Sequence, residues 1–186
     1  MKRLRLLCEK FWLMIMIQIF LFSMPLNAQT KTPFSNSLVK QASMLRLPVK
    51  GSDRFIQITV LSKSVGAALI AFPGEDSRVV RGFKYLVSDG VLGFIGVLEQ
   101  YWYKDQFFDN ASIVVYISPE YGGYTVGYSV SKDDETLQES MFPLNGVKFY
   151  DALKSDKTPV FSVSSDKETY DAVLKWAKIK VNEYSE

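Results

Sequence analysis

Residues 94–130 read FIGVLEQYWYKDQFFDNASIVVYISPEYGGYTVGYSV, and the second half of this stretch has the most regular pattern in the chain. Residues 124–130 alternate between apolar or aromatic side chains and small ones, which is typical of a β-strand with one buried face. Residues 112–118 alternate in the same way. The sequence between them, 119–123, contains one proline and two glycines, which predicts the loop of a hairpin.

Aromatic residues are the most distinctive feature of this stretch. Three of them are consecutive, and three neighbouring side chains cannot all face the interior of a strand or a helix. At least one is therefore expected to meet solvent or a partner, whereas Tyr124 and Tyr128 are expected to fill the core beneath a C-terminal helix. The predicted ligand- or partner-binding residues are Tyr101, Trp102, Tyr103, Tyr116 and Tyr121.

The N-terminus has the three-part layout of a secretory signal peptide. Basic residues precede an apolar run at 11–22, and a segment ending at Ala28 offers a cleavage site. The run is shorter than the roughly 20 apolar residues that span a bilayer, although an uncleaved anchor is the alternative. We therefore expect a signal peptide at 1–28, a flexible leader at 29–36 and a single domain at 37–186.

The charge balance changes when the signal segment is set aside. Residues 1–28 hold four of the 22 basic and one of the 20 acidic residues, which leaves 18 basic and 19 acidic residues and a net charge of −1. A nucleic-acid partner is not expected, because binding one requires a basic surplus. The only cysteine is Cys8, so no internal disulfide can form. A periplasmic or secreted location is expected, with membrane contact only through the signal peptide.

The rest of the chain predicts a mixture of strands and helices. Strands are expected at 55–61, 65–72, 79–87 and 159–163, from alternation or from short apolar runs. Short helices are expected at 37–47 and 146–154, the second capped by Asn145. Residues 91–102 have apolar side chains at helical spacing, so a helix is predicted there, although a strand buried on both faces fits the same residues.

The last element is the clearest helix. Ser165 and Glu168 match a capping box, which predicts a helix start. An apolar stripe follows that should pack on the sheet. The predicted fold class is thus α+β, with a largely antiparallel sheet packed by this C-terminal amphipathic helix and one or two shorter helices. The residues of the stripe are Tyr170, Val173, Leu174, Ala177 and Val181.

The absence of histidine limits the chemistry that the chain can perform. Without histidine, and with Cys8 in the signal segment, histidine-assisted nucleophiles and ordinary zinc sites are excluded. An enzyme would have to rely on other groups, such as Asp105 and Asp109, which would share one face if the preceding helix continued. The cluster at 133–135 could offer oxygen ligands to Ca²⁺, but solvated loop charges explain it better. We expect no metal and no cofactor.

These observations favour binding over catalysis. The leading hypothesis is an exported, non-enzymatic binding module for a small ligand or glycan, which uses an aromatic-rich surface. The alternatives are an inhibitor or accessory protein that binds another exported protein, and a histidine-free hydrolase that uses carboxylates.

Overall fold

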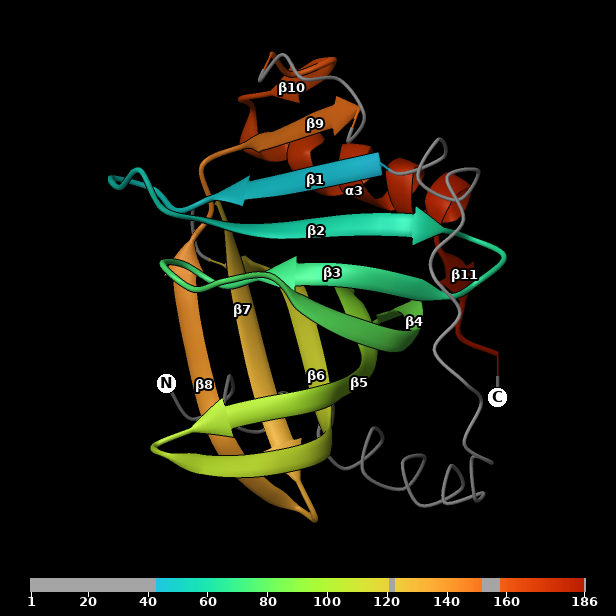
Figure 1. Cartoon of the computed structure of the whole chain (residues 1–186). Helices are drawn as coiled ribbons and strands as arrows, with labels where there is room; N and C mark the ends of the chain where they lie inside the picture. The colour runs from blue at the N-terminus through green and yellow to red at the C-terminus, as the bar shows by residue number, and fades with distance from the viewer. Residues whose placement is uncertain (1–42, 121–122, 152–157, 186) are drawn as a thin grey trace. The chain divides into compact units, whose positions relative to one another are not determined.

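The computed structural model describes residues 43–120, 123–151 and 158–185 (Figure 1). All of them belong to one compact unit, residues 35–186. The predicted signal peptide, the leader and Tyr121 lie outside the described residues.

The described residues form one large sheet and one helix, α3 (Asp166–Lys180). The strands are ordered β10-β9-β1-β2-β3-β4-β5-β6-β7-β8, and all neighbours in this order are antiparallel. The sheet curls, so that in Figure 1 β1 to β3 run across the direction of β6 to β8. The strands are β1 (Ser43–Pro48), β2 (Phe55–Ser62), β3 (Ala67–Ala71), β4 (Arg78–Ser88), β5 (Val91–Tyr103), β6 (Gln106–Glu120), β7 (Gly123–Lys132), β8 (Glu135–Pro143), β9 (Val147–Asp151), β10 (Phe161–Val163) and β11 (Asn182–Glu183), which pairs with β4 in parallel.

The two ends of the sheet meet at Leu144, between β8 and β9. Its N–H donates to the carbonyl of Tyr124 at 2.9 Å, which continues the pairing with β7, and it also forms an antiparallel bridge with Val49, just after β1. Asn145 then donates its N–H to the carbonyl of Pro48 at 2.9 Å, and β9 pairs with β1 from there onward. The chain thus leaves one end of the sheet and joins the other, which closes the sheet at this corner.

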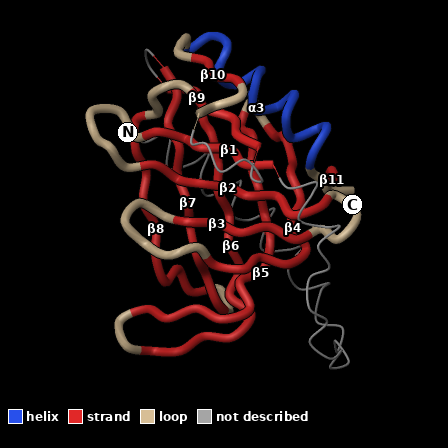
Figure 2. Tube along the Cα trace, turned by 45° about the horizontal axis from the view of Figure 1, so that its top comes forward, coloured by secondary structure: helices blue, strands red, loops and turns tan. Residues whose placement is uncertain are grey.

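Helix α3 covers one side of the core. Figure 2 shows it beside the sheet, between β10 and β11. The predicted apolar stripe is confirmed, because Val173, Ala177 and Val181 are buried and Tyr170 and Leu174 pack against the core. Trp176, which lies outside the predicted stripe, also contacts Phe94 and Phe149, at ring-centroid distances of 6.2 and 6.3 Å.

The predictions for strands are confirmed, and the prediction of a sheet-rich, largely antiparallel fold with a C-terminal helix is confirmed with them. Strands β2, β4, β6 and β7 cover the segments that alternation indicates, whereas β3 and β10 lie within the predicted 65–72 and 159–163 and begin two residues later. The hairpin of β6 and β7 lies where the proline and glycines predict it. The prediction of shorter helices is wrong for the described residues, which contain α3 as their only helix.

Three segments predicted as helical are strands. Residues 43–47 of the predicted 37–47 helix form β1, and residues 147–151 form β9, where Val147 and Phe149 face the core and Tyr150 faces away. Asn145 caps no helix, because the residues that follow it, Val147–Asp151, form β9. The backbone groups of both segments are satisfied by neighbouring strands, so tertiary pairing overrides a weak local helical pattern.

Residues 91–102 are the largest correction, because they lie in β5 and pair with β4 and β6. The inward positions run from Phe94 through Gly96 to Leu98, and a Cβ at Gly96 would collide with Val80. Beyond Leu98 the alternation changes parity, opposite Asn110 with its φ of 53°. The next buried residue is Tyr101, so the large inward residues are spaced by four and then three, which imitates a helix.

Candidate functional site

The predicted site residues at 101–103 lie on the outer half of the β5–β6 hairpin. Trp102 pairs directly with Phe107, and Tyr101 pairs with Phe108. The turn is made by Lys104 and Asp105, whose φ angles are 48° and 64°. Two central residues with positive φ suit a tight hairpin, because the twist of this turn matches that of the strands.

The three consecutive aromatic residues alternate between the two faces of this hairpin. Tyr101 is fully buried and Tyr103 stacks on it at 6.3 Å, so both side chains lie on the inner face. Trp102 points the other way and exposes 59% of its surface. The expectation that at least one of the three meets solvent is therefore met by Trp102. The structure separates Trp102 from its two neighbours.

The exposed side of the hairpin carries four side chains that we call the hairpin platform: Trp102, Phe107, Gln100 and Asp109. Phe107 is 49% exposed, and its ring lies 5.3 Å from that of Trp102. Gln100 and Asp109 are the next cross-strand pair on this face. Lys132 donates to the Asp109 carbonyl at 3.0 Å and lies 3.9 Å from its carboxylate. The platform thus combines two flat apolar rings with an amide and a carboxylate.

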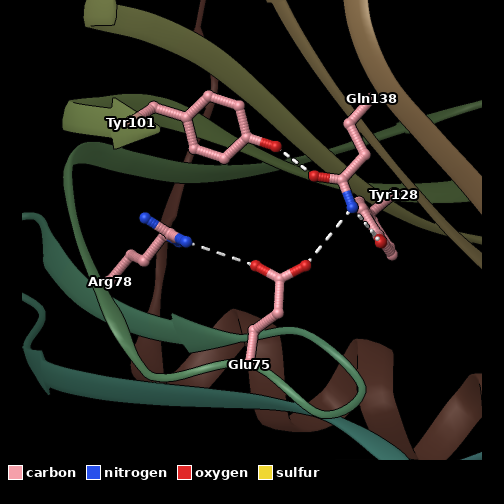
Figure 3. Close-up of polar contacts among 5 residues, drawn as sticks. All are labelled: Glu75, Arg78, Tyr101, Tyr128 and Gln138. Atoms are coloured by element: carbon pink, nitrogen blue, oxygen red, sulfur yellow. Dashed lines mark hydrogen bonds and ion pairs between the residues drawn. The ribbon is translucent and has the colours of Figure 1, made fainter. Parts of the chain in front are cut away.

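A polar network surrounds Tyr101 on the inner face (Figure 3). The Tyr101 hydroxyl donates to Gln138 Oε1, and Gln138 Nε2 donates to the Tyr128 hydroxyl at 2.8 Å and to Glu75 Oε1 at 3.3 Å. Arg78 pairs with the other oxygen of Glu75 at 3.3 Å. These five residues come from β4, β5, β7, β8 and the loop between β3 and β4, so the network ties that loop to β8.

Burial sets the chemical state of this network. It raises the pKa of Tyr101 far above the usual 10.0, and the nearby Glu75 carboxylate raises it further. Tyr101 therefore stays protonated and acts as a hydrogen-bond donor, not as a nucleophile. Tyr128 is held from the other side by Phe72, whose ring stacks on it at 4.1 Å. Tyr128 is buried, as expected, although it packs on Phe72 and it is Tyr124 that stacks on α3, through Tyr170 at 5.8 Å.

The remaining predicted site residues do not join this group. The ring of Tyr116 covers Gly127, where a Cβ would collide with it, so Tyr116 fills space above a glycine on the neighbouring strand. Tyr121 lies outside the described residues. Sequence reasoning missed Phe107 as the partner of Trp102. Placing a hairpin turn at Lys104 and Asp105 would have paired Trp102 with Phe107. The predicted helix over 91–102 gives no such pair.

Carboxylates give little support for catalysis in the described residues. Asp105 lies in the hairpin turn and Asp109 in β6, so the helical face that they were expected to share does not exist. Asp133 and Asp134 form the exposed turn between β7 and β8, with φ angles of 47° and 69°. Among the described residues, no group of three or more acidic, cysteine or histidine side chains is placed to hold a metal ion.

No helix in the described part of the chain has the length and apolar character needed to cross a bilayer. No family model, curated protein or solved structure matches the chain. Any proposal for its function therefore depends on the chemistry of its own residues.

Proposed function

We propose that the protein is an exported, non-enzymatic binding module that holds a glycan on the hairpin platform. The observation that carries the proposal is the exposure of Trp102 and Phe107 side by side, at 59% and 49% of their surfaces. Exposed apolar side chains that lie in contact with one another form a surface patch of the kind that marks binding sites. Their flat faces suit the apolar C–H face of a sugar ring.

The polar half of the platform supports a glycan in particular. Gln100 offers an amide donor and acceptor, and Asp109 offers an acceptor whose side chain is 70% exposed. Both flank the aromatic pair on the same strands. A sugar hydroxyl both donates and accepts hydrogen bonds, so these groups complement the rim of a ring stacked on Trp102. Lys132 holds Asp109 in place.

The test is binding of the full chain and of Trp102→Ala to insoluble chitin, cellulose and peptidoglycan. We expect the wild type to be retained on at least one of them and Trp102→Ala to lose most of that retention. The loss of binding should exceed any loss of stability, because Trp102 is mostly exposed. Ile179→Ala is the matched control, since Ile179 is also 59% exposed but lies on α3.

Two outcomes would count against the proposal. One is equal retention of Trp102→Ala and the wild type. The other is a large fall in melting temperature of Trp102→Ala with binding intact, which would make Trp102 a packing residue. Retention by none of the three polysaccharides, together with Trp102-dependent capture of a protein from an envelope fraction, would favour the inhibitor or accessory role. A projecting aromatic pair suits a protein interface as well.

A further inference from the structure

The outward face of β9, β1 and β2 carries an arginine that is fixed in place. Arg46 points away from the core side chains Leu45 and Leu47 on the same strand. Its Nε–H donates to Gln57 Oε1 at 2.8 Å. Its guanidinium carbon lies 4.5 Å from the centre of the Phe55 ring and 4.7 Å from that of Tyr150. Two cation–π contacts and one hydrogen bond thus hold a side chain that is usually mobile on a protein surface.

A second cation stands directly beside it. Lys148 on β9 is the cross-strand partner of Arg46 and is exposed. Like charges at paired positions oppose sheet formation. The ion pairs among the described residues join Arg78, Arg81 and Lys132 to carboxylates, and include neither Arg46 nor Lys148. No ion pair among the described residues therefore offsets the repulsion between Arg46 and Lys148.

More positive charge lies at the adjoining β1–β2 turn. Lys50 is exposed there, two residues after Pro48 at the end of β1. The chain beyond residue 28 is close to neutral, with 18 basic and 19 acidic residues, so this basic face is a local feature. We call the outward surface around Arg46 the Arg46 face and define it by Arg46, Lys148 and Lys50.

We propose that the Arg46 face binds the carboxylates of an acidic polysaccharide. The Nε–H bond to Gln57 leaves the terminal N–H groups of Arg46 to grip one carboxylate in a two-pronged contact, with Lys148 adding charge. Two cations on an open sheet face hold a single small anion only weakly in water. A chain with repeated carboxylates can engage several cations at once, so its contacts add up.

This inference shares with the proposed function only the assumption that the ligand is a glycan, and it uses different residues. The two can therefore fail separately. Trp102→Ala should leave binding at the Arg46 face unchanged, and substitutions at the Arg46 face should leave retention on neutral polysaccharides unchanged.

The experiment measures binding of soluble polygalacturonate to the full chain across a series of NaCl concentrations. We expect Arg46→Gln and Lys148→Gln each to weaken binding about tenfold at low salt and to reduce the slope of log K against log salt by about one. Arg46→Lys should recover only part of the affinity, because lysine keeps the charge but not the planar fork. Lys175→Gln, an equal charge change on the exposed side of α3, is the control.

Lys148 is exposed, so Lys148→Gln tests the idea even if Arg46→Gln weakens the fold. Wild-type affinity in Lys148→Gln and Arg46→Lys would overturn the proposal, as would an equal loss in Lys175→Gln. If millimolar inorganic phosphate displaced all of the bound polygalacturonate, the Arg46 face would be a site for a small anion, and the proposal would be overturned. Absence of polygalacturonate binding by the wild type would do the same.

Discussion

Tyr101 owes its role to the network around it. The residue belongs to a run of three aromatics, and its side chain is buried while its hydroxyl donates to the partly buried Gln138. The acceptor, Gln138, is only partly buried, so removing the donor should cost about as much as an ordinary hydrogen bond contributes. Tyr101→Phe should therefore lower the free energy of unfolding at neutral pH by about 0.5–1.5 kcal/mol, as measured by urea titration.

The same substitution should change how stability depends on pH. In the folded protein the pKa of Tyr101 is raised above the 10.0 of an exposed tyrosine. The folded state therefore keeps a proton that the unfolded state loses, so this contribution is complete below pH 10 and declines as pH rises above it. Tyr101→Phe should reduce the decline by up to about 1.4 kcal/mol per pH unit. An unchanged decline would contradict this. Tyr184→Phe, at a partly exposed tyrosine, is the control.

At the scale of the element, helix α3 forms as predicted but begins differently. The Ser165 side chain makes no capping hydrogen bond, so the predicted capping box is wrong. The Glu168 N–H, to which a capping serine side chain would bond, donates instead to the Ser165 carbonyl at 3.2 Å, and this carbonyl also accepts from the Thr169 hydroxyl at 2.8 Å. Thr169 is buried, so its hydroxyl needs this acceptor. The helix starts through backbone geometry and packing, not through its first side chain.

Substitutions at these two positions should separate the two modes of helix initiation. Ser165→Ala should cost less than about 0.5 kcal/mol, compared with about 1 kcal/mol for a typical serine cap. Thr169→Val keeps the shape but removes the hydroxyl, and should cost about 1 kcal/mol. Thermal unfolding followed by circular dichroism measures both. A larger loss of stability in Ser165→Ala than in Thr169→Val would show that the Ser165 side chain does cap the helix.

At the scale of the whole described unit, closure of the sheet depends on one tight corner. Leu144 donates its N–H to Tyr124 of β7 and lies opposite Val49, which follows β1, and Gly146 comes two residues later with a φ of 68°. A Cβ at Gly146 would collide with the Val163 carbonyl of β10. Only glycine satisfies both the backbone angle and the contact. At Gly146 the chain passes close to β10 and then enters β9, which pairs with both β1 and β10.

Gly146→Ala should lower the free energy of unfolding by at least about 3 kcal/mol, because it combines backbone strain with a backbone clash. Gly74→Ala is the matched control, since Gly74 has a φ of 86° but its Cβ would meet no atom within 4 Å. Strain alone should cost that variant about 1–2 kcal/mol. Chemical denaturation of both variants measures the difference, and equal losses would show that the corner is not crowded.

An element can be predicted from the sequence when the residues that determine it lie close together in the chain. The β6–β7 hairpin and α3 are predictable because alternation, turn residues and a helical stripe all lie within short windows. Strand β5 resembles a helix in sequence because Gly96 and the parity change near Asn110 alter the spacing of its inward residues. The role of Gly96 depends on its contact with β4, and the parity change depends on the pairing of β5 with β6, so neither can be recognised from β5 alone. The partners of Tyr101 come from four other segments, so no spacing in the sequence could join them.

The sequence by itself determined the available chemistry, the positions of most strands, the C-terminal helix and the requirement that one of three consecutive aromatics face outward. These depend on side-chain type and on periods of two or 3.6 residues, which are local. Tertiary structure alone decided that Trp102 is the exposed one and lies beside Phe107, that Arg46 is fixed next to Lys148, and that the sheet closes at Leu144. These depend on strand register, which pairs residues far apart in the chain.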